Sequence, residues 1–494
     1  MGKGKILTKS KYLIGLQCLK YLWIACNKPS RIPKPDSATQ YRFDQGHLVN
    51  TFAKKLFPEG IAIPTDDFMG NIEKTKDLIR QHKPLFEAGI LAGDTYSRID
   101  ILNPASNGTW DIIEAKSSTK VKDEHVQDVS FQKYCCEKFG LKINKCILVY
   151  INNKYIKHGD IDPNGLFTEE DITDDVNKAM EGIQERVNNM IATINFGKCP
   201  DVVIGQHCKN NPYDCPLIGE CWSFLPSDNV FELYYGGHKS FELFRDGIYA
   251  IKDIPDGFDL SDRQIIQKKC ARCNKPYIDK EAIKSFLSTF RYPLYYLDFE
   301  TFMSAIPLLD GTSPYQQIPF QFSLHVLKDP NSKVEHYSFL ADGAEDPRPK
   351  FLSSLKDVLG STGSIVVYYK SFEEKRLKEL SNTFPENKTW IENALARIVD
   401  LRDIFSNFYY CNCAQKGSTS LKDVLPAVTG ISYEGMNVSS GEDASISFMN
   451  ITFHGVTEEE RVEARKDLEK YCCLDTEGMF RIVEEMSKLI GNDL

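Results

Sequence analysis

The chain of 494 residues is longer than one hydrophobic core usually organises, so we expect two or three domains. Hydrophobic residues make up 42% and charged residues 26%, which is typical of a folded globular protein and argues against extensive disorder. The formal net charge of −9 argues against a generally basic surface for nucleic acid, but it leaves room for a local basic cleft.

No apolar run approaches the roughly 18 residues that cross a bilayer. The first residues also lack the apolar region of a signal peptide. We therefore expect a cytoplasmic protein with no membrane partner. Fifteen cysteines in a reducing compartment are not expected to form a disulfide framework, so their spacing must indicate which of them bind metal.

The first chemical pattern is a cysteine in an expected helix followed much later by three cysteines in a loop. Residues 7–26 have helical apolar spacing, with Ser10 as the expected cap and Cys18 inside the element. The later segment is rich in Gly, Pro, Asn and Asp, and it contains Cys208, Cys215 and Cys221. Three thiols with little apolar surface nearby indicate a structural zinc or an iron–sulfur cluster, which needs a fourth ligand.

Between these cysteines lies a pattern of carboxylates. Residues 42–55 are expected to form a helix, and two strands at 93–102 and 110–116 are expected to pair as a hairpin. This pairing brings Asp100 towards Glu114 and Lys116, the last two of which share one face of their strand. Two carboxylates can hold Mg²⁺, while the ammonium can orient water and stabilise phosphate charge.

In their order, these motifs resemble the RecB-like PD-(D/E)XK nucleases with a four-cysteine iron–sulfur cluster, of the CRISPR adaptation exonuclease type. The resemblance covers about the first 225 residues, and Cys136 departs from it by standing where the family often has Tyr. It implies a Mg²⁺ or Mn²⁺ site and a [4Fe–4S] cluster. The implied metal-site residues are His47, Asp100, Glu114, Lys116 and Gln132, and the implied cluster ligands are Cys18, Cys208, Cys215 and Cys221.

Residues 226–289 carry mixed signals, and we interpret them as a connecting subdomain. Cys270 and Cys273 form a close pair whose nearest possible partners are Cys411 and Cys413. A zinc ion bound by these four is an alternative to packed core thiols.

The carboxy-terminal half, 290–494, begins with an apolar strand that presents Asp298 and Glu300 on one side. Two such carboxylates need a cation or a proton to share a buried spot. Further strands are expected at 318–327, 337–340 and 364–369, with a helix at 347–359.

Two later positions extend this acidic pattern. The strand at 364–369 leads into a helix with Ser371 as the expected cap, which places Glu373 or Glu374 where sites form in α/β sheets. Near the end of the chain, Tyr471 and Asp475 lie one helical turn apart on the same face.

These three acidic motifs, on the first strand, at the start of the later helix and on the terminal helix, together resemble the DnaQ-like DEDD exonucleases of the ribonuclease H fold. The resemblance is to the Tyr-containing version and covers about residues 290–490. The resemblance implies two metal ions held by Asp298, Glu300, Glu373 and Asp475, with Tyr471 orienting the attacking water. At the second acidic motif, Glu373 stands where the family has Asp, and Asp400 is the alternative residue for that position. The whole chain also resembles a little-characterised bacterial family that combines the two halves.

The expected protein is thus α/β, with a PD-(D/E)XK restriction-endonuclease-like domain followed by a ribonuclease H-like domain. We expect a two-site, metal-dependent nuclease that degrades single-stranded DNA ends, 3′ to 5′ in the second half. The alternatives are an RNA exonuclease, a nucleic-acid-binding iron–sulfur scaffold with inert sites, and zinc in place of iron. No GxxxxGK[ST] phosphate loop is present, so any unwinding motor is a separate helicase or other repair or defence protein.

Overall fold

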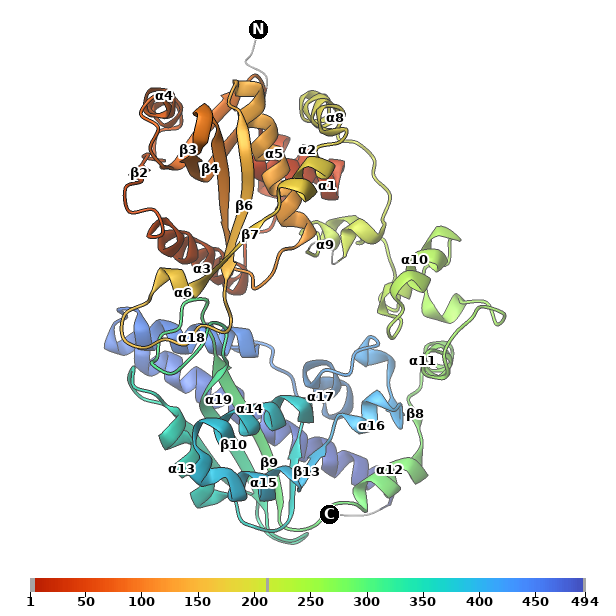
Figure 1. Ribbon diagram of the computed structural model, residues 1–494. Helices are drawn as coiled ribbons and strands as arrows, with labels where there is room; N and C mark the ends of the chain where they lie inside the picture. Colours follow the sequence, from red (N-terminus) through yellow and green to blue (C-terminus); the bar gives the residue numbers. More distant parts are fainter. Residues whose placement is uncertain (1–4, 210–212, 492–494) are drawn as a thin grey trace. The chain divides into compact units, whose positions relative to one another are not determined.

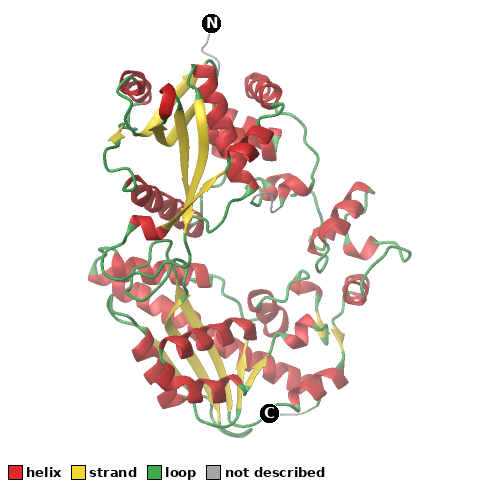
Figure 2. Cartoon of the chain, in the orientation of Figure 1, coloured by secondary structure: helices red, strands yellow, loops and turns green. Residues whose placement is uncertain are grey.

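The computed structural model describes residues 5–209 and 213–491, as a mixed α/β protein (Figure 2). It divides into two compact units. The first holds the described residues up to Phe224 together with Ser304–Gln316, and the second holds the remainder. The expected boundary after residue 225 lies beside this division. The expected connecting subdomain, 226–289, clusters with the second unit, where its strand β8 (Tyr277–Ile278) pairs with β14 (Tyr410–Cys411).

The first unit is built on a seven-stranded sheet (Figure 1). Six strands follow the order β2-β3-β4-β5-β6-β7, and the short β1 pairs with β4 in parallel. The β4–β5 pair is antiparallel, as expected for a hairpin. The strands are β1 (Leu7–Thr8), β2 (Ile61–Ala62), β3 (Leu85–Ala92), β4 (Thr95–Pro104), β5 (Trp110–Lys116), β6 (Ile143–Ile151) and β7 (Phe167–Asp171).

Alternation along β5 decides what each face of this sheet contacts. Ile112 belongs to the same buried cluster as Phe131 of α5 (Asp123–Phe139). Ile113 packs instead in a cluster with Val49 of α3 (Ser37–Lys54). Because successive side chains of a strand point to opposite faces, the even-numbered Glu114 continues the α5 face.

The helix expected over 7–26 is two helices, α1 (Lys9–Gln17) and α2 (Leu19–Asn27). Cys18 separates them with an extended backbone, φ −161° and ψ 123°. Thr8, not the expected Ser10, caps the first helix by accepting a hydrogen bond from the amide of Lys11. The other helices of the unit are α4 (Phe68–Ile79), α6 (Pro163–Leu166), α7 (Thr173–Ala179), α8 (Ile183–Asn195) and α9 (Ile218–Cys221).

The second unit contains a five-stranded sheet of order β11-β10-β9-β12-β13. Strand β9 lies at the centre, antiparallel to β10 and parallel to β12, and β13 continues the parallel side. Four of these strands coincide closely with those expected from the sequence. The strands are β9 (Leu294–Phe302), β10 (Ile318–Leu327), β11 (Glu335–Leu340), β12 (Ser364–Val367) and β13 (Ile398–Asp400).

Helices cover both faces of this sheet (Figure 2). On one face, Leu297 of β9 packs in a cluster with Phe351 of α13 and Leu377 of α14. The other face lies against α18 and the long terminal helix α19, both of which contact β9. Alternation therefore turns Asp298 and Glu300 towards α19. These helices are α13 (Arg348–Val358), α14 (Lys370–Thr383), α15 (Lys388–Leu395), α18 (Gly441–Phe453) and α19 (Glu458–Leu489).

One expected helix start is wrong. The cap of α14 is Tyr369, in a left-handed conformation, and Ser371 lies inside the first turn. The remaining helices of the unit are α10 (Gly237–Arg245), α11 (Asp262–Cys273), α12 (Lys280–Leu287), α16 (Asp403–Ser406) and α17 (Leu421–Thr429). Among the residues that the structure describes, no helix is long and apolar enough to cross a membrane.

Candidate functional site

The carboxylates of β9 meet the terminal helix. Ligand atoms of Asp298, Glu300 and Cys472 lie within 4.8 Å of one another, and the Cys472 thiol donates to Asp298 Oδ2 at 3.7 Å. Burial and neighbouring carboxylates raise the pKa of both acids well above their usual range. The expectation that Asp298 and Glu300 share one side of the strand is thus consistent with this geometry.

Asp475 and Tyr471 extend the same cluster from α19. The Asp475 carboxylate is 6% exposed and accepts hydrogen bonds from the hydroxyls of Tyr433 and Tyr471. These bonds oppose the effect of burial, which nevertheless raises the pKa of Asp475 to about 6. Burial and the charge of Asp475 also raise the pKa of Tyr471 far above its usual range, so this phenol stays protonated.

Glu373 joins the cluster from the first turn of α14. It is 1% exposed, and burial followed by the nearby charge of Asp298 raises its pKa well above the usual range. Its Oε2 atom has no hydrogen-bond partner among the described residues. Glu374 instead forms ion pairs with Lys370 and Lys378, which separates the roles of the two adjacent glutamates.

Asp400, the alternative for Glu373, has a different task at the end of β13. Its carboxylate accepts hydrogen bonds from the backbone amides of Tyr369 and Lys370, at 3.0 and 2.9 Å. These are the first amides of α14, which lacks a capping side chain of its own. Asp400 therefore serves as the helix cap, because the first amides of a helix need acceptors.

The cluster as a whole has a strong excess of negative charge. Burial raises the pKa of all four carboxyl groups, and neighbouring carboxylates raise those of Asp298, Glu300 and Glu373 further. Lys422 of α17 acts on Glu300 and Asp475 in the opposite direction. Hard divalent cations prefer such oxygen ligands, and the unpartnered Glu373 Oε2 provides a free one. The donor set therefore fits Mg²⁺ or Mn²⁺.

An open cavity of about 600 Å³ leads to these acids, and Asp298, Tyr471 and Asp475 line it. Its wall is aromatic and cationic. Tyr235 is 80% exposed, and Tyr369 lies 5.0 Å under the guanidinium of Arg402. The further lining residues are Tyr234, Tyr368, Lys422 and the segment 417–421.

Two of these tyrosines have unusual backbones. Tyr235 has φ +45° and Tyr369 has φ +81°, which is uncommon for residues with a side chain. Such conformations concentrate at functional sites, where the surrounding structure maintains them. No local pattern identified either residue as part of a site, since they come from distant segments.

The first unit holds a second cluster of charges, on the α5 face of its sheet. Glu114 is 1% exposed and accepts hydrogen bonds from Lys116 at 2.6 Å and from Gln132 at 2.7 Å. Sequence reasoning missed two members, Lys9 and Asp128. Lys9 donates to Glu114 at 2.9 Å, and Lys116 donates to Asp128 at 2.5 Å. Asp128 lies four residues before Gln132 on one helix face, a spacing that could have identified it.

The two acids of this cluster differ in their electrostatics. Burial and the charge of Glu114 raise the pKa of Asp100 to about 7. For Glu114 itself, burial is outweighed by Lys116 and Lys9, which hold its pKa below the usual range. His47, expected as a metal ligand, is exposed on α3, and its ring makes no hydrogen bond or ion pair within the described ranges. The charges of this cluster are therefore largely paired.

The four expected cluster ligands lie around one small cavity: Cys18, Cys208, Cys215 and Cys221. Each acts electrostatically on the others, and burial with these neighbours raises the pKa of Cys215 to about 11. Tetrahedral zinc would bring sulfur atoms to about 3.8 Å from one another. Among the described residues, no three of these sulfurs fall within 4.8 Å of one another, so they are too far apart for this spacing.

The other candidate cysteine set does not close around an ion. Cys270, Cys411 and Cys413 share a buried cluster in the second unit, and the Cys270 thiol donates to the carbonyl of Cys411 at 3.6 Å. Cys273 is exposed at the end of α11. Core packing therefore accounts for the three gathered thiols.

Comparison with known proteins adds relatives whose roles are not described. Residues 295–420 match the domain of unknown function DUF2779, which includes Asp298, Glu300 and Glu373. The chain is 29% identical over 218 residues to an uncharacterised protein of Mycoplasma genitalium and 27% identical over 219 residues to one of Mycoplasma pneumoniae. Each match covers 40% of this chain. The chain spans about a third (33%) of the length of each of these relatives.

Proposed function

We propose that the second unit is a metal-dependent phosphodiesterase that removes nucleotides from single-stranded DNA ends. One observation carries the proposal: the carboxyl groups of Asp298, Glu300, Glu373 and Asp475, all with raised pKa values, gather at the end of an open cavity. Such a concentration of charge costs stability unless a cation is bound. Perturbed acids in a cleft are typical of catalytic sites.

The topology supports the same proposal. Counted along the chain, the strands of the second sheet have the order 3-2-1-4-5, with only the second antiparallel to its neighbours β9 and β11. This order is compatible with a ribonuclease H-like fold, which the DnaQ-like sequence motifs of this half also predict. For the first unit, we propose the PD-(D/E)XK class on the basis of its sequence motifs alone.

In the proposed reaction, a water molecule loses a proton to solvent and forms a bond to the phosphorus of the terminal phosphodiester. The bond from this phosphorus to the 3′ oxygen of the preceding nucleotide breaks, and that oxygen takes up a proton from solvent. The four carboxylates would hold Mg²⁺ or Mn²⁺, which stabilises charge on the attacking and leaving oxygens. Tyr471 stays protonated, so it positions the water by a hydrogen bond and does not remove its proton. Tyr433 fixes the orientation of Asp475.

The wall of the cavity favours a single strand as the substrate. Exposed aromatic rings stack on unpaired bases, and each such contact contributes roughly 1–3 kcal/mol. Tyr235 and Tyr369 present such rings, and Arg402 and Lys422 offer positive charge for phosphates. The cavity of about 600 Å³ lies within the roughly 300–1,000 Å³ of small-ligand pockets, so it has room for the terminal nucleotide of a strand.

For the first unit we propose a second metal-dependent nuclease site formed by Asp100, Glu114 and Lys116. The observation that favours it is the convergence of these side chains with Gln132 on one face of the sheet. Lys9 and Lys116 both donate to Oε1 of Glu114, whereas Oε2 accepts, among the described residues, only from Gln132 and keeps a lone pair for a metal ion. His47 lies on α3, which packs on the opposite face of β5 from Glu114, so the structure does not bring it to these acids.

We also propose a [4Fe–4S] cluster at the four cysteines of the first unit. The chemistry of the donors supports it, because four thiolates around one cavity favour soft iron–sulfur coordination. Ligation of Cys18 and Cys208 closes a loop of about 190 residues, which ties the amino-terminal helices to the end of the unit. Binding would release the thiol protons and stabilise the fold.

The test compares adjacent glutamates of one helix turn. Purified protein with Mn²⁺ is incubated with end-labelled single-stranded DNA, alongside Glu373→Gln and the matched control Glu374→Gln. We expect Glu373→Gln to lose cleavage by at least about 100-fold, since metal-site ligands act only when complete, and the control to cleave as the parent does. Equal activity of all three proteins would refute the site.

The same assay separates the alternatives. Loss of one polarity in Asp298→Ala and of the other in Lys116→Ala supports two sites, whereas equal loss in both contradicts them. Preferential cleavage of labelled RNA identifies a ribonuclease. Binding of the strand without any cleavage would indicate a nucleic-acid-binding scaffold. Duplex DNA that is cleaved only after a helicase is added would indicate that the protein works with a separate helicase.

A further inference from the structure

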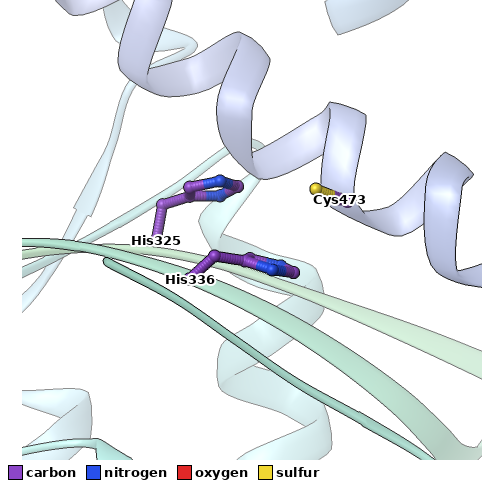
Figure 3. Close-up of side chains that lie close together, drawn as sticks. All are labelled: His325, His336 and Cys473. Atoms are coloured by element: carbon purple, nitrogen blue, oxygen red, sulfur yellow. The ribbon is translucent and has the colours of Figure 1, made fainter. Parts of the chain in front are cut away.

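A second group of possible metal ligands lies beside the carboxylate cluster, on the same sheet and helix (Figure 3). It consists of His325 on β10, His336 on β11 and Cys473 on α19. The two histidines are direct cross-strand partners, and their ring centroids lie 4.5 Å apart. Ligand atoms of all three residues lie within 4.8 Å of one another.

A chain of hydroxyl groups determines which ring nitrogens are free. Thr476 Oγ1 lies 3.1 Å from the carbonyl oxygen of Cys473, 2.8 Å from His325 Nδ1 and 2.7 Å from Ser323 Oγ. A carbonyl can only accept, so Thr476 gives it its single proton. His325 Nδ1 and Ser323 Oγ must then both donate to Thr476.

The same reasoning extends to the second histidine. Ser323 Oγ uses its proton on Thr476, so it accepts from His336 Nε2, which lies 2.9 Å away. His325 therefore keeps its lone pair on Nε2, and His336 keeps its lone pair on Nδ1. In metal sites, the second nitrogen of a ligating histidine usually donates to such a fixed acceptor.

The surroundings of the two rings fix their orientation and keep them neutral. Ser323 and Thr476 are 1% and 0% exposed, so the hydroxyl chain that orients both rings is itself buried. Burial lowers the pKa of both histidines, that of His325 to about 4, which keeps the imidazoles neutral. Glu469 and Glu477 of α19 add negative charge near His336.

We propose that His325, His336 and Cys473 bind a Zn²⁺ ion, with water in the fourth position. Two neutral imidazoles and one thiolate match the nitrogen and sulfur preference of zinc, and three protein ligands plus water form a common zinc site. Binding forms one Zn–S and two Zn–N bonds and releases the thiol proton of Cys473 to solvent. The carboxylate cluster, by contrast, offers the oxygen ligands of Mg²⁺ or Mn²⁺.

The ion would join two strands to the terminal helix. Cys473 is adjacent to Cys472, which contacts Asp298, and α19 also carries Tyr471 and Asp475. A zinc ion would therefore hold the helix that supplies the carboxylate cluster. The binding proposal itself does not depend on nuclease activity, since its test is a metal content.

The experiment measures zinc retained by the full chain after reconstitution of its iron and dialysis against a zinc buffer. The variants are His336→Gln and Cys473→Ser. His336 is exposed, and a glutamine amide can still donate to Ser323, so the fold is expected to persist. The control is Cys273→Ser, which removes an exposed thiol elsewhere in the same unit. Circular dichroism with chelator present verifies that each protein is folded.

We expect the parent and Cys273→Ser to retain one equivalent of zinc more than His336→Gln and Cys473→Ser. Replacement of zinc by Co²⁺ should give the absorption of a cobalt–thiolate bond, and this band should be absent from Cys473→Ser. Equal zinc content in all four proteins would overturn the proposal. A loss in Cys273→Ser as large as in Cys473→Ser would overturn it as well.

Discussion

Replacement of Asp475 by asparagine is expected to stabilise the metal-free protein while it abolishes cleavage. Burial raises the pKa of this carboxyl from 3.8 to about 6. Each unit of pKa difference corresponds to about 1.4 kcal/mol, so the ionised group costs about 3 kcal/mol above pH 6. Asparagine keeps an oxygen that can accept from Tyr433 but carries no charge.

The sign follows from proton binding. An acid whose pKa is higher in the folded state holds its proton there longer, so the folded protein loses stability as pH rises from about 4 to about 6. Chelated wild-type protein should show this loss, and Asp475→Asn should lack it. Mn²⁺ at pH 8 should reverse the order, since it stabilises only the protein with the complete ligand set.

Urea denaturation is carried out in chelator at pH 4.5 and pH 8 and followed by hydrogen exchange of peptides from α19. It measures the difference in the free energy of unfolding of the second unit between wild type and Asp475→Asn. Glu463→Gln, an exposed acid on the same helix, is the matched control and should change stability little. The reasoning is refuted if Asp475→Asn is less stable than wild type in chelator at pH 8.

Three further results are expected from other parts of the chain. Tyr235→Ala should weaken single-strand binding roughly 10-fold by fluorescence anisotropy and leave stability within about 0.5 kcal/mol, because this ring is 80% exposed; unchanged affinity would remove the ring from the binding surface. Lys116→Met should abolish cleavage by the first unit, while Lys120→Met, an exposed neighbour, should not; equal activity would exclude the lysine from the chemistry. Cys215→Ser should lose visible iron–sulfur absorption and the fold of the first unit, measured by limited proteolysis, whereas a colourless wild-type protein with bound zinc would contradict the cluster.

Local patterns sufficed wherever one element places the side chains. The period of two on β9 predicted that Asp298 and Glu300 share a side, and the helical turn predicted the same of Tyr471 and Asp475. The strand at 318–327 was predicted to the residue, and the structure buries it along its whole length. The prediction failed at Ser371, because the structure caps α14 with Asp400 from another strand.

Contacts between distant segments were beyond the sequence. Glu373 was separated from Glu374 only by the fold, which buries one beside Asp298 and pairs the other with lysines. Lys9 likewise enters the first cluster because β1 and α1 lie beside β4, more than a hundred residues before Glu114.

The sequence by itself determined the periodic elements and the identity of the acids and thiols that they carry, because hydrophobic spacing is a local property. The tertiary structure alone decided how charge is balanced. It left four carboxylates of the second unit crowded, paired those of the first unit with Lys9 and Lys116, and aligned His325, His336 and Cys473. Burial and Coulomb energy depend on which distant segments meet, and no local pattern encodes that.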